Sequence, residues 1–125
     1  MNGYAIMLAG AFALSATAAN ACDSEMLGRY NTVISPRDTY SSSGQRLGSV
    51  AAIIQQDRAN YHRFGRRDRG DGHDDLFHSA QARAMIPQWM SSRWVAPVVA
   101  DAVRRGSARI TVLVYQGCMA AVFSD

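Results

Sequence analysis

The spacing of apolar and polar residues predicts strands near both ends of the chain and helices between them. Residues 30–34 are rich in strand-forming side chains, and Ser35-Pro36 ends this run. Residues 108–115 and 118–123 are two further β-rich runs, and Gln116-Gly117 between them predicts a hairpin. The first run of the hairpin is apolar on both faces, which indicates a strand in the middle of a sheet or one covered by helices.

Three segments between these strands have helical spacing. The first covers residues 45–64, where apolar side chains recur every three or four positions except at one position, which is polar. The second is capped by Asp71 or Asp74 and continues to residue 86, and Pro87 then ends or kinks it. The third covers residues 97–105 and is followed by a glycine. We therefore expect an α+β fold in which a small antiparallel sheet, made of the C-terminal hairpin and the N-terminal strand, packs against about three helices.

The first 21 residues are typical of a cleavable signal peptide. Residues 4–14 are apolar, and Ala19-Asn20-Ala21 has the small-x-small form that signal peptidase accepts. The apolar stretch is too short to favour a membrane-spanning helix of about 20 residues. We expect cleavage before Cys22, export to the periplasm or the extracellular space, and a single mature domain of residues 22–125 with no transmembrane segment.

The chain has two cysteines, Cys22 and Cys118. An even pair in an exported chain predicts one disulfide, which would tie the first mature residue to a strand near the C-terminus. An alternative is lipidation of Cys22 as in bacterial lipoproteins, which would leave Cys118 unpaired. The residues before Cys22 match the lipoprotein processing sequence poorly.

Charge is carried by arginine rather than lysine, and the formal net charge is +3. This charge permits weak attraction to anionic groups, and arginine can grip phosphates or carboxylates through two hydrogen bonds. Four arginines in residues 63–69 could hold a phosphate, or they could pair with the four aspartates of the same loop. We expect the self-paired loop, a protein or an anionic ligand as partner, no nucleic acid, and a monomer.

The polar position in the apolar stripe of the first helix is Asp57, a carboxylate where an apolar residue would continue the stripe. Such a group must be paired or lie at the edge of the buried face. Local conflicts of this kind often mark sites. One hypothesis makes Asp57 and His62 an acid–base pair, with Arg58 and Arg63 stabilising an anion. The alternative is a structural ion pair with an arginine of another element.

A second group of candidates is His73, Asp74, Asp75 and His78. Histidine and aspartate can bind a divalent metal, but this spacing does not place the two histidines on one face of a helix. Helix-capping aspartates in a solvated loop explain the same residues. We therefore expect no metal and no cofactor.

Trp89 and Trp94 lie in a Met- and Trp-rich segment that could line an apolar groove or belong to the core. The candidate binding residues are Arg58, Tyr61, Arg63, Arg66, Trp89 and Trp94. The leading hypothesis is an exported binding or interaction protein of the cell envelope or extracellular space. The alternative is a small secreted hydrolase, acting on phosphodiesters, that uses Asp57 and His62.

Overall fold

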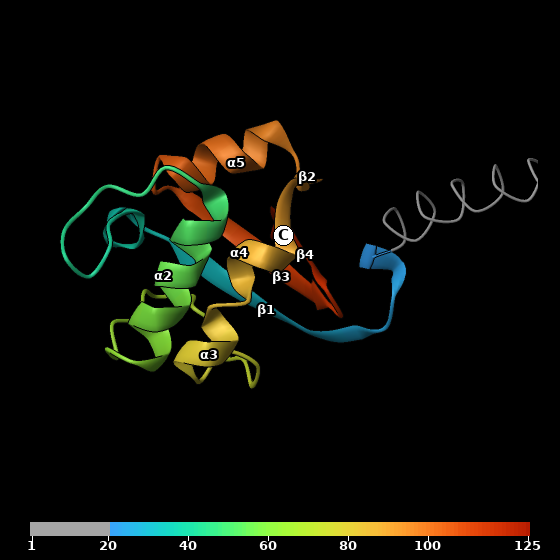
Figure 1. Ribbon diagram of the computed structural model, residues 1–125. Coiled ribbons are helices and arrows are strands. Elements are labelled where there is room, and N and C mark those ends of the chain that lie inside the picture. The colour runs from blue at the N-terminus through green and yellow to red at the C-terminus, as the bar shows by residue number, and fades with distance from the viewer. Residues whose placement is uncertain (1–20) are drawn as a thin grey trace, which may run out of the picture.

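The computed structural model describes residues 21–125, so the predicted signal peptide lies almost wholly outside the described residues. These residues form a mixed four-stranded sheet in the order β1-β3-β4-β2 (Figure 1). The strands are β1 (Met26–Ile34), β2 (Met90–Val95), β3 (Ala108–Tyr115) and β4 (Cys118–Phe123). The strand pairs β1–β3 and β3–β4 are antiparallel, whereas β2 runs parallel to β4. The predicted α+β class is therefore confirmed, with a sheet larger than expected.

The β3–β4 hairpin has the predicted bounds, and its turn contains Gly117 at a positive φ of 77°. β3 lies between β1 and β4, as its two apolar faces predicted. The prediction missed β2. Only Met90 and Val95 of this strand have paired partners, with a register shift between them. A strand this irregular has no clear two-residue alternation, so the pattern did not indicate it.

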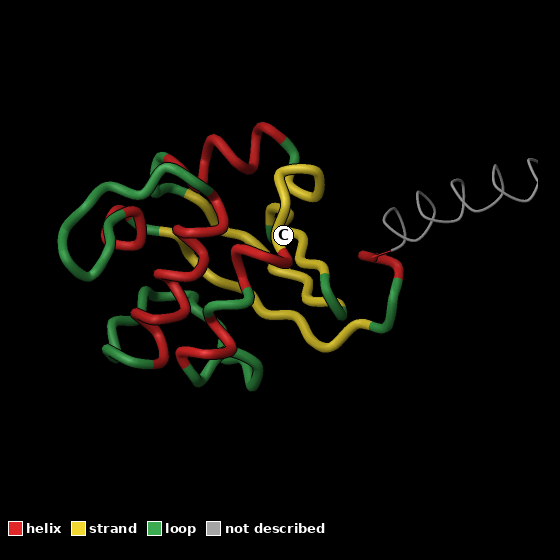
Figure 2. Tube along the Cα trace, in the orientation of Figure 1, coloured by secondary structure: helices red, strands yellow, loops and turns green. Residues whose placement is uncertain are grey.

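Figure 2 shows that the helices of the described residues are short apart from one. They are α2 (Val50–His62), α3 (Ala80–Arg83), α4 (Ile86–Trp89) and α5 (Pro97–Arg104), with two 3-10 turns, η1 (Ala21–Asp23) and η2 (Pro36–Thr39). α2 begins later than predicted because Ser49 caps it, accepting a hydrogen bond from the Ala52 amide at 3.1 Å. α5 matches its prediction to within one residue.

The predicted second helix is wrong in its first half. Residues 71–79 form a loop, and α3 begins only after the Ser79 side chain accepts a hydrogen bond from the Ala82 amide at 3.0 Å. Pro87 does not end a helix but lies in the first turn of α4, where its missing amide costs no hydrogen bond. This loop becomes important because it carries most of the candidate site.

The core lies between the helices and one face of the sheet. α2 and α4 lie in front of the sheet in Figure 1, and α5 lies at its upper end. Ile110, Val112 and Val114 of β3 point into this core and are at most 1% exposed. Ile53 and Ile54 of α2 face them and are fully buried.

The predicted disulfide joins Cys22 in η1 to Cys118 at the start of β4, 96 residues apart. Closing a loop of this length stabilises the folded state by about 4–5 kcal/mol in the chain-entropy model. Among residues 21–125, no helix is both long enough and apolar enough to cross a bilayer.

Candidate functional site

Arg58 of α2 is fully buried, and its guanidinium joins three segments of the chain. Its Nε donates to Asp57 Oδ2 at 2.9 Å and its Nη2 to Thr32 Oγ1 of β1 at 3.0 Å. Its Nη1 donates to Asp74 Oδ2 at 2.7 Å and to the Gly72 carbonyl at 3.1 Å. We call Arg58, Thr32, Asp57 and Asp74 the Arg58 network. The sequence left open whether Asp57 is paired or lies at the edge of the core. In the Arg58 network Asp57 is paired, and it is buried at 1% exposed.

Two tyrosine rings enclose the same guanidinium. The Arg58 Cζ lies 4.2 Å from the centroid of Tyr30 and 4.6 Å from that of Tyr61. A second arginine, Arg67, lies 4.0 Å from the Tyr61 ring and donates from Nε to the Tyr61 carbonyl at 3.3 Å. Cation–π contacts of this kind are strongest when the cation is desolvated, as Arg58 is. Tyr61, a predicted binding residue, therefore packs against the buried cation.

Thr32 shows how protons are shared inside the network. Its hydroxyl lies 2.9 Å from Asp57 Oδ2 and 3.0 Å from Asp71 Oδ1. One hydroxyl carries one proton, so it can donate to only one of these two carboxyls. Burial raises the pKa of Asp57 to about 8, against the opposing effect of Arg58. Burial therefore favours a protonated Asp57, with the proton on Oδ1, the oxygen that does not accept from Arg58. This Oδ1 lies 3.0 Å from Thr32 Oγ1 and donates to it, which leaves the Thr32 hydroxyl to donate to Asp71.

Asp74 has the opposite electrostatic character. Its Oδ2 accepts from Arg58 and lies 2.8 Å from His62 Nε2, while its Oδ1 accepts from the amides of Leu76 and Phe77 at 2.9 and 2.7 Å. Although burial acts to raise it, hydrogen bonds from His62 and Arg58 hold the pKa of Asp74 below its usual value. Burial lowers the pKa of His62, and Asp74 opposes this effect. At neutral pH His62 is thus a neutral imidazole whose Nε2–H donates to a carboxylate.

The loop of residues 71–79 is docked closely against β1. The Asp71 carboxylate accepts from the Val33 amide at 2.9 Å, and the Gly72 amide donates to the Asn31 carbonyl at 2.6 Å. A Cβ on Gly72 would lie 2.7 Å from that carbonyl oxygen, so only glycine permits this approach. The loop is therefore a fixed element of the structure.

Above this floor, three exposed side chains of the loop converge. His73 Nε2 lies 2.9 Å from Asp75 Oδ1, and His78 Nε2 lies 3.8 Å from the same oxygen. One ligand atom from each of the three lies within 4.8 Å of the others, a grouping that could hold a metal ion. We call His73, Asp75 and His78 the histidine cluster. His62 borders it, with its ring centroid 4.4 Å from that of His78.

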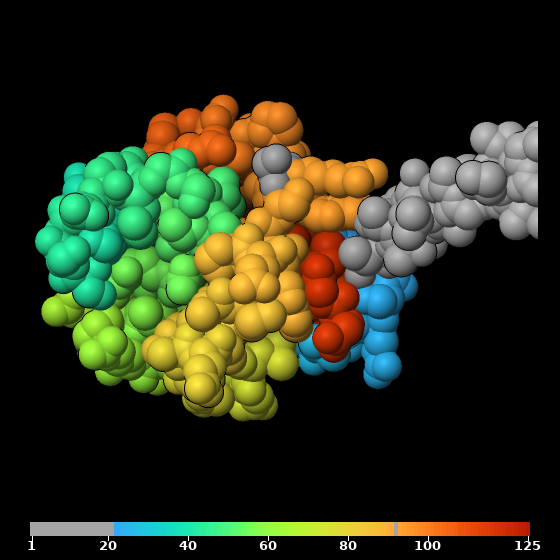
Figure 3. All heavy atoms as spheres, viewed as in Figure 1, coloured from blue at the N-terminus to red at the C-terminus, as the bar shows by residue number. Residues whose placement is uncertain are grey.

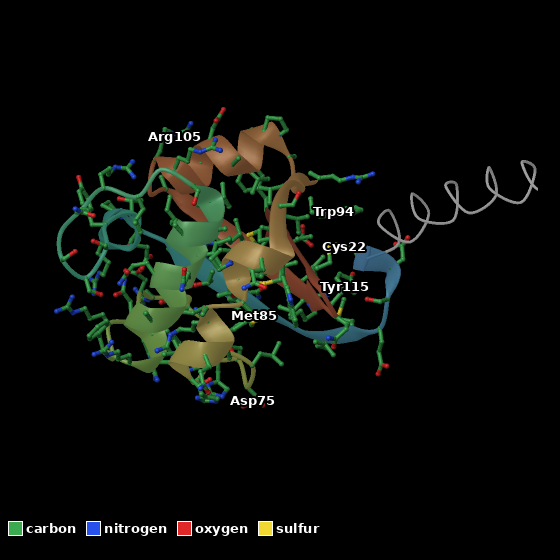
Figure 4. All side chains as sticks on the ribbon, in the orientation of Figure 1. Cys22, Asp75, Met85, Trp94, Arg105 and Tyr115 are labelled. Atoms are coloured by element: carbon green, nitrogen blue, oxygen red, sulfur yellow. A yellow bond between two sulfur atoms is a disulfide. The ribbon has the colours of Figure 1, made fainter. Side chains whose placement is uncertain are left out.

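The backbone of the loop explains why these side chains meet. Asp74 and Phe77 are buried and anchor the loop from beneath, while His73, Asp75 and His78 are exposed and face outward. Figure 4 shows Asp75 at the lower end of the molecule, far from Arg105 at the end of α5. The earlier objection to these histidines concerned spacing along one helix. It does not apply, because residues 73–78 are not helical.

The remaining candidates are dispersed. Asp57 and His62 each have a different partner and form no hydrogen bond with one another among the contacts of the described residues. Arg63 and Arg66 are exposed, and both guanidiniums lie over the ring of Phe64 at 5.0 and 5.5 Å.

The two tryptophans also lie apart from the histidine cluster. Trp89 is half-buried against the core, where it borders a small apolar cavity of about 110 Å³ with Leu27 and Met85. Trp94 on β2 is half-buried beside Arg93. Neither ring forms part of the Arg58 network.

Sequence reasoning did not find Thr32 or Tyr30, and it named Asp71 only as a possible helix cap, whereas Asp71 accepts hydrogen bonds from Thr32 and Val33. Thr32 and Tyr30 read as ordinary residues of a strand, and nothing nearby in the sequence marks their partner, which lies 26 residues away from Thr32. The one local signal was the polar Asp57 in an apolar stripe. Comparison with known proteins found no match: no family model, no curated protein and no solved structure matches this chain.

Proposed function

We propose that this chain is an exported binding protein whose histidine cluster holds a divalent transition-metal ion. The observation that carries the proposal is the convergence of His73, Asp75 and His78 on a loop that Asp74 anchors. Neutral imidazole and carboxylate are ligands that suit Zn²⁺, Ni²⁺ and Cu²⁺. Two nitrogens and one oxygen leave a position for water or a further ligand.

Export is the part of this proposal that rests on the signal-like residues 1–21 and on the disulfide. A disulfide between Cys22 and Cys118 fits an oxidising compartment, either the periplasm or the extracellular space. Lipidation would need the same Cys22 sulfur that the disulfide uses, so the two modifications exclude one another. A binding role is the leading hypothesis of the sequence analysis, and the histidine cluster adds a divalent metal ion as the proposed ligand.

The test is calorimetric titration of the purified, oxidised protein with Zn²⁺. We expect one equivalent to bind, and Asp75→Asn to weaken binding at least about tenfold. Asp101→Asn is the matched control because Asp101 is also an exposed carboxylate, on α5, beside Arg104. Equal Zn²⁺ affinity for Asp75→Asn and the wild type would refute the metal site.

A second candidate function is the hydrolase alternative, which one observation favours in altered form. His62 is hydrogen-bonded to the buried Asp74 carboxylate, an arrangement that orients an imidazole for general base work. Asp74, rather than Asp57, would then be the partner of His62. Turnover of bis(p-nitrophenyl) phosphate, abolished by His62→Ala with the melting temperature nearly unchanged, would favour this candidate. Unfolding of His62→Ala would make the histidine structural.

A further inference from the structure

A cavity of about 350 Å³ lies between α2, α3 and residues 41–47, and no residue of the histidine cluster lines it. Two arginines line it, Arg63 at the end of α2 and Arg83 on α3. Ser41, Ser42, Gln55 and Gln56 add hydroxyl and amide groups, and no carboxylate is among the described residues that line it. In Figure 3 this side faces the viewer, with α2 in green, residues 41–47 in teal and α3 in yellow.

Arg83 is the unusual residue of this cavity because it is a buried cation, 6% exposed, without a carboxylate partner. Its Nη1 donates to the carbonyls of Phe77 and His78 at 3.0 and 2.7 Å. Within residues 21–125, neither Arg83 nor Arg63 forms an ion pair with a carboxylate. Buried charges are ordinarily paired, as Arg58 is in the same molecule.

The neighbouring cation increases the imbalance. Burial and then the positive charge of Arg63 lower the pKa of Arg83, and the negative charge of Asp74 opposes them. Two arginines that repel one another across a cavity would both be stabilised by an anion placed between them. An arginine fork also matches a carboxylate or phosphate group with two parallel hydrogen bonds.

We propose that this cavity binds a small organic anion whose carboxylate or phosphate group pairs with Arg83 and Arg63. The volume is at the lower end of the range for small-molecule sites, so the anion is small. The Gln56 Nε2 donates to Ser42 Oγ at 3.3 Å and to Asn60 Oδ1 at 3.0 Å. The Gln56 amide is therefore a fixed polar group that faces the remaining part of the bound anion. This site uses none of the side chains of the histidine cluster, although Arg83 also donates to the His78 main-chain carbonyl.

The experiment measures the melting temperature of the purified protein with inorganic phosphate, glucose 6-phosphate or citrate at millimolar concentration. Sodium chloride of equal ionic strength is the control for screening. We expect at least one of these anions to raise the melting temperature beyond the salt control, because a ligand that binds only the folded state stabilises it. A response to phosphates alone or to citrate alone identifies the head group.

Arg63→Gln is the main variant because Arg63 is exposed, and we expect substitution of an exposed side chain to leave the fold intact. We expect this variant to bind the anion at least about tenfold more weakly, because one charge-assisted hydrogen-bonded pair is lost. Arg66→Gln is the matched control, since Arg66 is exposed nearby but does not line the cavity. Ala59→Glu is a second variant, which places a carboxylate in the cavity and should abolish the response. No response beyond salt, or equal responses in the wild type and Arg63→Gln, would overturn the proposal whatever the result with Zn²⁺.

Discussion

Asp57 and Asp74 bond to the same guanidinium, yet they belong to two regions with opposite character. Asp57 lies on the inner side, enclosed with Thr32, where burial raises its pKa to about 8. Asp74 lies on the outer side, where hydrogen bonds from His62 and Arg58, opposing the effect of burial, hold its pKa below the usual value. Burial thus favours the neutral form of the first carboxyl, whereas hydrogen bonds from His62 and Arg58 favour the charged form of the second.

This difference separates structure from binding within one network. The inner region has a protonated carboxyl and a hydroxyl that satisfy one another, so it needs no ligand. In the outer region the charged Asp74 fixes His62 and the loop that carries the histidine cluster. Burial therefore makes Asp57 a structural group, whereas Asp74 fixes the loop whose exposed side chains form the histidine cluster.

The largest expected effect is that of Arg58→Met, which removes the cation that both regions share. The charged Asp74 would remain buried without its main partner, and breaking a buried pair in this way costs about 3–5 kcal/mol. Urea unfolding measures the change, with the exposed Arg93→Met as control, expected within about 0.5 kcal/mol of wild type. A loss below about 1 kcal/mol would mean that Arg58 does not hold the regions together.

Asp74→Asn should have the next largest effect. The substitution removes a charged acceptor from Arg58, and in either orientation the Asn NH2 group, a donor, faces the donors of Arg58 and His62 or the amides of Leu76 and Phe77. We therefore expect a loss of about 2–3 kcal/mol in unfolding free energy. Asp75→Asn, one position along and 89% exposed in its side chain, is the matched control and should change stability little. The comparison is sharpened if Asp75→Asn weakens Zn²⁺ binding while Asp74→Asn mainly destabilises the fold.

The α+β class and the hairpin could be predicted because they depend on local alternation. The disulfide could be predicted because the chain has only two cysteines. By contrast, the path of residues 71–79 depends on Asp74 reaching Arg58, a contact across 16 positions. Residues 70–75, which include three aspartates and two glycines, are compatible with a helix cap or with a loop.

The site could be located in part and not assembled. Asp57 was noticeable because a carboxylate interrupts an apolar stripe, but its partner Thr32 lies on a strand 25 positions earlier. His62 and Asp57 are close in sequence and pair with different groups, since side chains five positions apart on a helix point in different directions. The pairing His62–Asp74 requires knowledge of where the loop docks.

Stability should fall as the pH rises from about 4 to 8, the interval between the ordinary carboxyl pKa and the folded pKa of Asp57. The folded pKa of Asp57 is raised above the unfolded one, so its contribution is complete below the ordinary carboxyl value and is lost as the pH rises through about 8. We expect a fall of at least about 1 kcal/mol. His62 acts in the opposite sense: its folded pKa is lowered, so stability is lost as the pH falls below its ordinary value of 6.5. Urea unfolding at a series of pH values measures both limbs.

Asp57→Asn should have the smallest effect and tests the comparison most directly. If Asp57 is protonated near neutral pH, an amide can replace it with similar shape and charge, and we expect a loss below about 1 kcal/mol at pH 6. The same variant should lack most of the fall in stability between about pH 4 and 8, whereas Asp101→Asn should keep it. If Asp57→Asn costs as much as Asp74→Asn, both carboxyls are ionised in the folded protein. The two regions would then share one electrostatic character, and the proton placed between Asp57, Thr32 and Asp71 would have to be abandoned.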